Sequence, residues 1–194
     1  MKVASLVQEY DPVAEVWTRI ADMPTPRDAA RGVSVAGKLY VLGGQIEGNR
    51  VIHAVEEYDP QTDRWARKSD MPTARIDFGL VTVDGGIYLV GGQIRQFVDD
   101  VIPFIEKYDP STDQWTQLGD MPSPRIEFST TTVNGRIFAI GGVSSLHPAG
   151  HERAGWPDIG TVTGLVDELD LGIANLGVDA QNRALRIWGG IKAR

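Results

Sequence analysis

The feature that most constrains the fold is a phrase that occurs three times in the sequence. Its copies begin at Val7, Val55 and Ile105, and a Tyr, a Trp, a Met and a Gly-Gly pair recur in each copy. Seven residues lead from Tyr to Trp, six from Trp to Met and twenty from Met to the first Gly, so the copies repeat after 48 and then 50 residues. A fixed period of this length is typical of repeat architectures, in which each unit packs on its neighbours.

Each repeat contains four segments with the pattern of short β-strands. The first is rich in β-branched residues, as in "GVSV", "GLVTV" and "STTTV". A two-residue turn follows, and the Asp84-Gly85 and Asn134-Gly135 pairs are typical of type I′ hairpins. A nearly continuous apolar strand comes next, then a strand that ends in Tyr-Asp-Pro or its like, and then a strand that carries the Trp. Four short antiparallel strands per repeat match one blade of a β-propeller.

At the diglycine, Tyr and Trp positions, residues 1 to about 143 resemble the kelch repeat family. The resemblance implies an all-β, kelch-type propeller segment of about three and a half four-stranded blades. It also implies that the diglycine ends the second strand and that the Tyr and Trp pack between neighbouring blades. The residues with these structural roles are Gly43, Gly44, Tyr58, Trp65, Gly91, Gly92, Tyr108 and Trp115, with Tyr10, Trp17, Gly141 and Gly142 from incomplete units.

The repeats divide the chain into a half blade at 1–20, full repeats at about 21–68 and 69–118, and the start of a further repeat at 119–143. Residues 144–194 then read as a long loop, a degenerate last repeat and a C-terminal tail, because Leu169 and Leu176 replace the Tyr and Trp. An unclosed arc leaves blade faces exposed. We therefore expect either a fragment of a longer propeller or self-association with a second chain or a partner that closes the ring.

An arginine follows the Met-Pro pair of every repeat, at Arg27, Arg75 and Arg125. Because strand direction alternates in a meander, this inter-blade connection and the length-variable loop edge the same face. One hypothesis therefore places the arginines at the rim of a central channel, where they bind an acidic peptide through paired hydrogen bonds. The alternative is that each arginine is buried against the next blade and bonded to carbonyls or acids, with Asp28, Asp77 and Glu127 as ready partners. His53, in the variable loop, is a surface residue or a ligand contact.

The amino-acid composition argues against several kinds of functional site. The chain has no cysteine, which excludes disulfides, thiolate catalysis and Cys-based metal sites. His147, His151 and Glu152 have the spacing of metal ligands on a helix, but Pro148 and Gly150 disfavour that helix, so no metal is expected. A catalytic triad and a cofactor fingerprint are both missing from the sequence, and we expect no cofactor.

The net charge of −7 argues against nucleic acid or an anionic membrane as partner. No apolar run is long enough to span a bilayer, and the apolar stretch after Met1 ends too early for a signal peptide, which leaves the compartment open. We therefore predict a non-catalytic module that binds a protein or peptide through propeller loops. The alternative is a carbohydrate-active enzyme of the kelch class, such as a sialic acid epimerase, with arginines that bind the substrate carboxylate.

Overall fold

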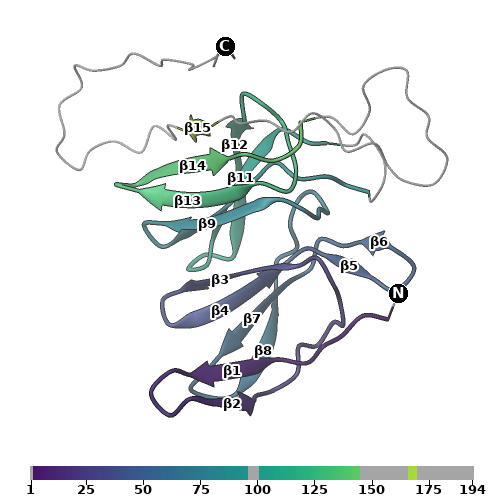
Figure 1. The fold of residues 1–194 in the computed structure, drawn as a ribbon, viewed down its shortest axis with the longest axis vertical. Coiled ribbons are helices and arrows are strands. Elements are labelled where there is room, and N and C mark those ends of the chain that lie inside the picture. The colour runs from purple at the N-terminus through teal and green to yellow at the C-terminus, as the bar shows by residue number, and fades with distance from the viewer. Residues whose placement is uncertain (1, 96–100, 145–165, 170–194) are drawn as a thin grey trace, which may run out of the picture.

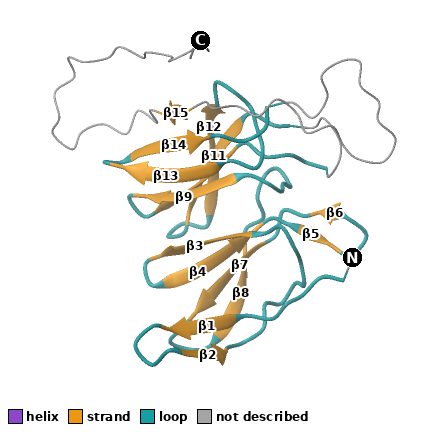
Figure 2. Cartoon of the chain, viewed as in Figure 1, coloured by secondary structure: helices purple, strands orange, loops and turns teal. Residues whose placement is uncertain are grey.

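The computed structural model describes residues 2–95, 101–144 and 166–169, and these residues form antiparallel β-sheets joined by loops (Figures 1 and 2). The sheets follow one another as blades of an open arc. The first sheet contains β1 (Gln8–Asp11) and β2 (Val16–Arg19), and the second contains β3 (Arg31–Val35), β4 (Lys38–Leu42), β7 (Val55–Asp59) and β8 (Arg64–Lys68). The third sheet contains β9 (Gly79–Val83), β10 (Gly86–Val90), β11 (Phe104–Asp109) and β12 (Gln114–Asp120), and the fourth contains β13 (Ser129–Val133), β14 (Arg136–Ile140) and β15 (Val166–Leu169). A separate loop hairpin is formed by β5 (Gln45–Ile46) and β6 (Arg50–Val51).

Each complete blade is a meander whose first strand lies innermost. The strand orders are β3-β4-β7-β8 and β9-β10-β11-β12, and β9 contacts both β3 and β13 across the blade boundaries. The inner hairpins turn through two residues with positive φ, such as Asp84 (47°) and Gly85 (77°). This is the type I′ geometry that the sequence predicts, and it matches the twist of the flanking strands. The described residues contain no helical segment with the length and apolarity that a membrane crossing requires.

Apolar cores lie between the blades. The core between the second and third sheets contains Leu42, Val55, Ile87 and Leu89, which are all fully buried. The middle strand β10 is buried on both faces, as its continuous apolar sequence predicts. In β14, by contrast, Ile140 is exposed, because no sheet in the described part of the chain covers the outer face of the last blade.

The Tyr and Trp of the second and third sheets connect each of these blades to the preceding one. The indole Nε1 of Trp65 donates to the carbonyl of Ala21 at 2.8 Å, and the Ala21 N–H donates to Asp63 Oδ1 at 2.8 Å. Tyr58 donates its hydroxyl proton to the same Asp63 oxygen and lies 5.1 Å from Trp65, measured between ring centroids. The next blade therefore binds both the backbone N–H and the backbone carbonyl of Ala21.

We call this arrangement of an acidic and an indole side chain the peptide clamp. The second clamp repeats the first: Trp115 Nε1 donates to the Ser69 carbonyl at 3.1 Å, and the Ser69 N–H donates to Asp113 Oδ1 at 2.9 Å. Asp63 and Asp113 both have left-handed backbone, with φ of 52° and 57°. The repeat in the sequence is thus a repeat of one inter-blade interaction.

Candidate functional site

The repeated arginines are buried between strands. Arg75 has no exposed surface; its Nη1 donates to the carbonyls of Gly91 at 3.0 Å and Phe104 at 3.4 Å, and its Nη2 forms an ion pair with Glu106. Arg27 does the same one blade earlier, with an ion pair of 2.8 Å to Glu56. Arg125 donates to the carbonyls of Ser123 and Ala139 at 3.1 and 2.8 Å. The three side chains therefore have the geometry of the buried alternative, and they do not line a rim.

The carboxylates that pair with these arginines are not those nearest in the sequence. Glu56 and Glu106 come from the third strand of the same repeat, whereas Asp28, Asp77 and Glu127 form no ion pair with an arginine among the described residues. Burial lowers the pKa of Arg75 and raises the pKa of Glu106, while their mutual attraction opposes both shifts. The pair stays charged because each ion is the other's partner in a dry site.

Two residues after each arginine, the chain turns through a corner with left-handed backbone. The corner residues are Ala29, Asp77 and Glu127, with φ of 50°, 54° and 52°. Such φ values are uncommon for residues with a Cβ, and the surrounding hydrogen bonds hold them. One example is the pair of backbone bonds of 3.0 Å between Ile76 and Gln93. At two of the three corners, the residue in this conformation, Asp77 or Glu127, lines a cavity.

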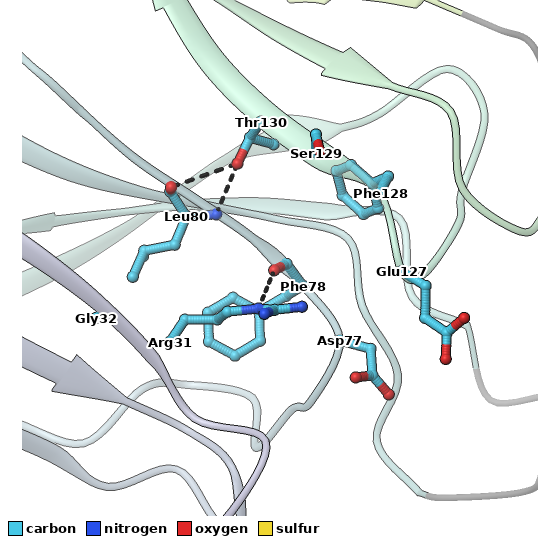
Figure 3. A pocket seen from close by; sticks show the side chains of 9 residues that line it. All are labelled: Arg31, Gly32, Asp77, Phe78, Leu80, Glu127, Phe128, Ser129 and Thr130. Carbon is cyan, nitrogen blue, oxygen red and sulfur yellow. Dashed lines mark hydrogen bonds between the residues drawn. The ribbon is translucent and has the colours of Figure 1, made fainter.

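The corners at Asp77 and Glu127 border a cavity of about 600 Å³ at the inner ends of three blades (Figure 3). It is lined by Arg31, Gly32, Asp77, Phe78, Leu80, Glu127, Phe128, Ser129 and Thr130. Figure 3 shows the carboxylates of Asp77 and Glu127 turned toward the same side of the cavity, away from Thr130. The lining therefore combines three charged side chains with Phe78, Leu80 and Phe128, and its accessible surface is mainly polar.

The hydrogen bonds around the cavity fix its walls. Thr130 Oγ1 accepts from the Leu80 N–H at 3.1 Å and lies 3.3 Å from the Leu80 carbonyl, which ties β13 to β9. Arg31 Nε donates to the Phe78 carbonyl at 3.3 Å across the neighbouring blade boundary. The amide of Gln93 donates to Asp77 Oδ2 at 2.9 Å and thereby orients that carboxylate. Hydrogen bonds thus orient the guanidinium of Arg31 and the carboxylate of Asp77, and the exposed carboxylate of Glu127 borders the same opening.

The sequence points to this corner through its arginines, for which it leaves two roles open, and the structure has the geometry of the buried one. In the sequence, Asp77 and Glu127 stand out only as partners of the arginines, and Arg31 does not stand out. The available signal was the recurrence of an acidic residue at the same place in two repeats, directly before the first strand. His53 is exposed, lies 3.9 Å from Asp70 Oδ2 and is outside the cavity lining. His147, His151 and Glu152 lie outside the described residues. The described part of the chain holds no group of three His, Asp or Glu residues that could bind a metal ion.

Comparison with known proteins agrees with the fold described above. The family model described as the KLHDC2/KLHL20/DRC7 Kelch-repeats domain matches residues 3–142. The solved structure titled "Structure of YjhT" is 20% identical and superposes with a TM-score of 0.63 over 75% of this chain, which spans 60% of that chain. At that identity the likeness shows the fold alone, and no curated protein sequence matches the chain. The match over residues 3–142, on the blades described above, shows that the chain belongs to the kelch-repeat family.

Proposed function

We propose that this chain is a protein-binding module that takes a polypeptide segment of its partner at the cavity formed by Arg31, Asp77 and Glu127. The observation that carries the proposal is the position of these charges, which come from three successive blades and converge on one opening. The kelch family supports it, because propellers of this type are generally used for protein interaction. The rigid blades would keep the charged groups in place before the ligand arrives, which reduces the entropy lost on binding.

The cavity changes the expected chemistry of the ligand. The acidic peptide predicted from the sequence relied on Arg27, Arg75 and Arg125, whose donors are bonded inside the protein. The groups at the opening are two carboxylates and one guanidinium. We therefore infer a segment with a lysine or arginine that binds Asp77 and Glu127, next to an acceptor that binds Arg31. A purely acidic segment would meet two like charges and would be repelled.

The experiment is a screen of an array of short peptides with varied charge, followed by affinity measurements on the peptides selected. The Asp77→Asn/Glu127→Gln variant should weaken binding of lysine-containing peptides by about ten-fold to a hundred-fold, as expected for loss of charge-assisted hydrogen bonds. Glu47→Gln is the matched control, since Glu47 is exposed on the β5–β6 hairpin, away from the cavity. Selection of acidic peptides whose binding survives the double substitution would contradict this proposal.

The same cavity also supports a second candidate, an enzyme that acts on an acidic sugar. Such an enzyme needs a guanidinium to bind the substrate carboxylate and a separate group that moves a proton. Arg31 could supply the first role, and Asp77 or Glu127 the second. NMR of sialic acid incubated with the protein in deuterated water would show exchange or epimerisation at carbon if this candidate holds. We expect the sugar to stay unchanged, because we propose binding without turnover.

A further inference from the structure

The two ends of the arc expose surfaces that are covered between the internal blades. At the N-terminal end, the ring of Trp17 is 66% exposed, although it stacks on Tyr10 with the same geometry as the Tyr58 and Trp65 pair. At the other end, Val133, Ile140 and Val166 are 52%, 42% and 60% exposed. Their counterparts one blade earlier are Val83, Val90 and Ile105, which are all buried. Both ends therefore carry one half of an inter-blade interface.

The N-terminal half blade also holds a peptide clamp without a peptide. Glu15 stands where Asp63 and Asp113 stand in the two occupied clamps, and its φ of 56° matches theirs. Trp17 stands where Trp65 and Trp115 stand. No hydrogen bond of the Glu15 carboxylate or the Trp17 indole is found within the described part of the chain. The clamp is preformed by the backbone and open to solvent.

The third blade ends in a backbone peptide, at Gly119, that is not bound by a clamp from a following blade in the described part of the chain. Gly119 occupies the position of Ala21 and Ser69, the two clamped residues, and a Cβ built on it would contact nothing within 4 Å. The degenerate repeat that follows in the sequence has Ala174 and Leu176 where a clamp needs an acid and an indole. Each chain thus has one unused clamp and one peptide that its own next repeat lacks the side chains to bind.

We propose that two copies of this chain form a closed dimer, in which the β1–β2 hairpin of one copy completes the blade begun by β13 and β14 of the other. In the second blade, β4 pairs with β7 so that Leu39 lies opposite Tyr58. The same register places Tyr10 of the second copy opposite Ile137 and brings its Glu15 and Trp17 to the Gly119 peptide. The hairpin takes the place of β15, the strand that pairs with β14 within the single chain.

The proposal also covers the remaining exposed faces. Leu39 and Val41 are only partly buried, whereas their counterparts Ile87 and Leu89 are completely buried by the blade before them. In the dimer, the outer face of the shared blade, with Val133 and Ile140, would cover the Leu39 and Val41 of the second copy. Two complete blades from each chain and two shared blades give a ring of six, within the range in which propellers close. The two-fold symmetry closes the assembly and prevents open-ended growth.

The inference does not depend on the proposed ligand, because Glu15, Trp17 and Gly119, which would form the intermolecular clamp, are not among the residues that line the cavity. Light scattering over a concentration series should show a mass that rises from 21.2 kDa to a plateau at twice that value. Trp17→Ala and Glu15→Ala should each raise the dimer dissociation constant at least ten-fold. Val13→Ser is the matched control, since Val13 is 93% exposed in the turn of the same hairpin and outside the clamp. Val166→Pro, which removes a strand that competes with the hairpin, should lower the dissociation constant.

Cross-linking tests the geometry directly, since the chain has no cysteine of its own. A short bismaleimide should join a Glu15→Cys chain to a Gly119→Cys chain when the two variants are mixed, and should join neither variant to itself. The Ala21→Cys/Asp63→Cys variant is the positive control, because that clamp is occupied within one chain. A monomer at every concentration, polydisperse growth beyond the dimer, or a dimer that neither Trp17→Ala nor the mixed cross-link affects would overturn the proposal.

Discussion

Arg75 is a buried charged residue, and the other repeats have an arginine at the same position. Its guanidinium bonds two main-chain carbonyls and one carboxylate, so it joins the start of one blade to the second and third strands of the same blade. Removal of one member of a buried pair leaves the other as an uncompensated charge, which costs more than the pair contributes as a whole. The stability of the corner therefore depends on both partners together.

Replacing Arg75 with Met should lower the free energy of unfolding by about 3–5 kcal/mol, because Glu106 would then be buried without its counterion. Urea denaturation followed by tryptophan fluorescence measures this change. The Arg75→Met/Glu106→Gln variant should regain much of the loss, since the buried charge is gone. Arg64→Met is the surface control, since Arg64 is exposed at the start of β8, and this variant should stay within about 0.5 kcal/mol of the parent protein. An equal loss in the single and double variants would show that the ion pair is not the cause.

The contribution of the peptide clamp to folding stability depends on pH through the carboxylate of Asp63. The N–H of Ala21 and the hydroxyl of Tyr58 hold the pKa of Asp63 below its usual range, and burial, with Asp63 as acceptor, raises the pKa of Tyr58 to about 12. Because the folded-state pKa of Asp63 is the lower one, its contribution to stability is complete above about pH 4 and is lost as the pH falls through the folded-state value.

Thermal unfolding at pH 7 and pH 3 should therefore show a smaller difference between the parent protein and Asp63→Asn at the lower pH. The asparagine keeps an acceptor for the Ala21 N–H but does not titrate. Asp22→Asn is a control, since Asp22 is exposed and lies outside the clamp. A difference that stays constant across the two pH values would mean that the Asp63 carboxylate does not act through its charge.

The four-stranded blade is the part of the structure that could be predicted best from the sequence alone. Positions with one strong local reason were predictable: Asp84 and Gly85 for the hairpin, and the apolar run of β10 for a strand buried on both faces. The pairing of Arg75 with Glu106 was not predictable, because the two residues are 31 positions apart and meet only once the sheet has formed. The cavity was missed for the same reason, since Arg31, Asp77 and Glu127 belong to three different repeats.

The diglycine shows what holds a blade against its neighbour. A Cβ on Gly92 would lie 2.7 Å from the Ile76 carbonyl, and its φ is 98°. Gly85 has a similar positive φ of 77°, but a Cβ there would meet nothing within 4 Å. Gly85→Ala should therefore cost about 1–2 kcal/mol from backbone strain alone, whereas Gly92→Ala should cost clearly more, because strain and steric overlap act together. Chemical denaturation compares the two, and equal losses would show that the close approach is unimportant.

The chain as a whole is an arc in which each blade contacts only its neighbours. Stability in such an arrangement is approximately a sum of terms for single units and for their interfaces. The third sheet has a neighbour on both sides, with Ile87 and Leu89 in one core and Tyr88 and Val90 in the other. Within the described residues, the first sheet contacts one neighbouring sheet, the second, and all residues of β1 and β2 are exposed.

Amide hydrogen exchange should follow this gradient. We expect the slowest exchange in β10 and β11, intermediate rates in β4 and β7, and the fastest in β1 and β2, because opening free energy tracks local burial. Measurement at a concentration below any self-association, by mass spectrometry of peptic fragments, gives the monomer's pattern. Uniform protection across all sheets would contradict it and would indicate a single cooperative unit.

At each corner, two different residues have two different roles. The buried arginine holds the backbone in place, and the residue two positions later occupies the left-handed turn. Arg27, Arg75 and Arg125 fix the chain from inside, and two residues later the same left-handed position is filled by an exposed alanine, a half-buried aspartate and an exposed glutamate. Since three different side chains occupy the same left-handed corner, positions 29, 77 and 127 could be varied with little effect on folding. Those positions form a natural set for a library of binders, in which new specificities are selected without any change to the residues that keep the blades together.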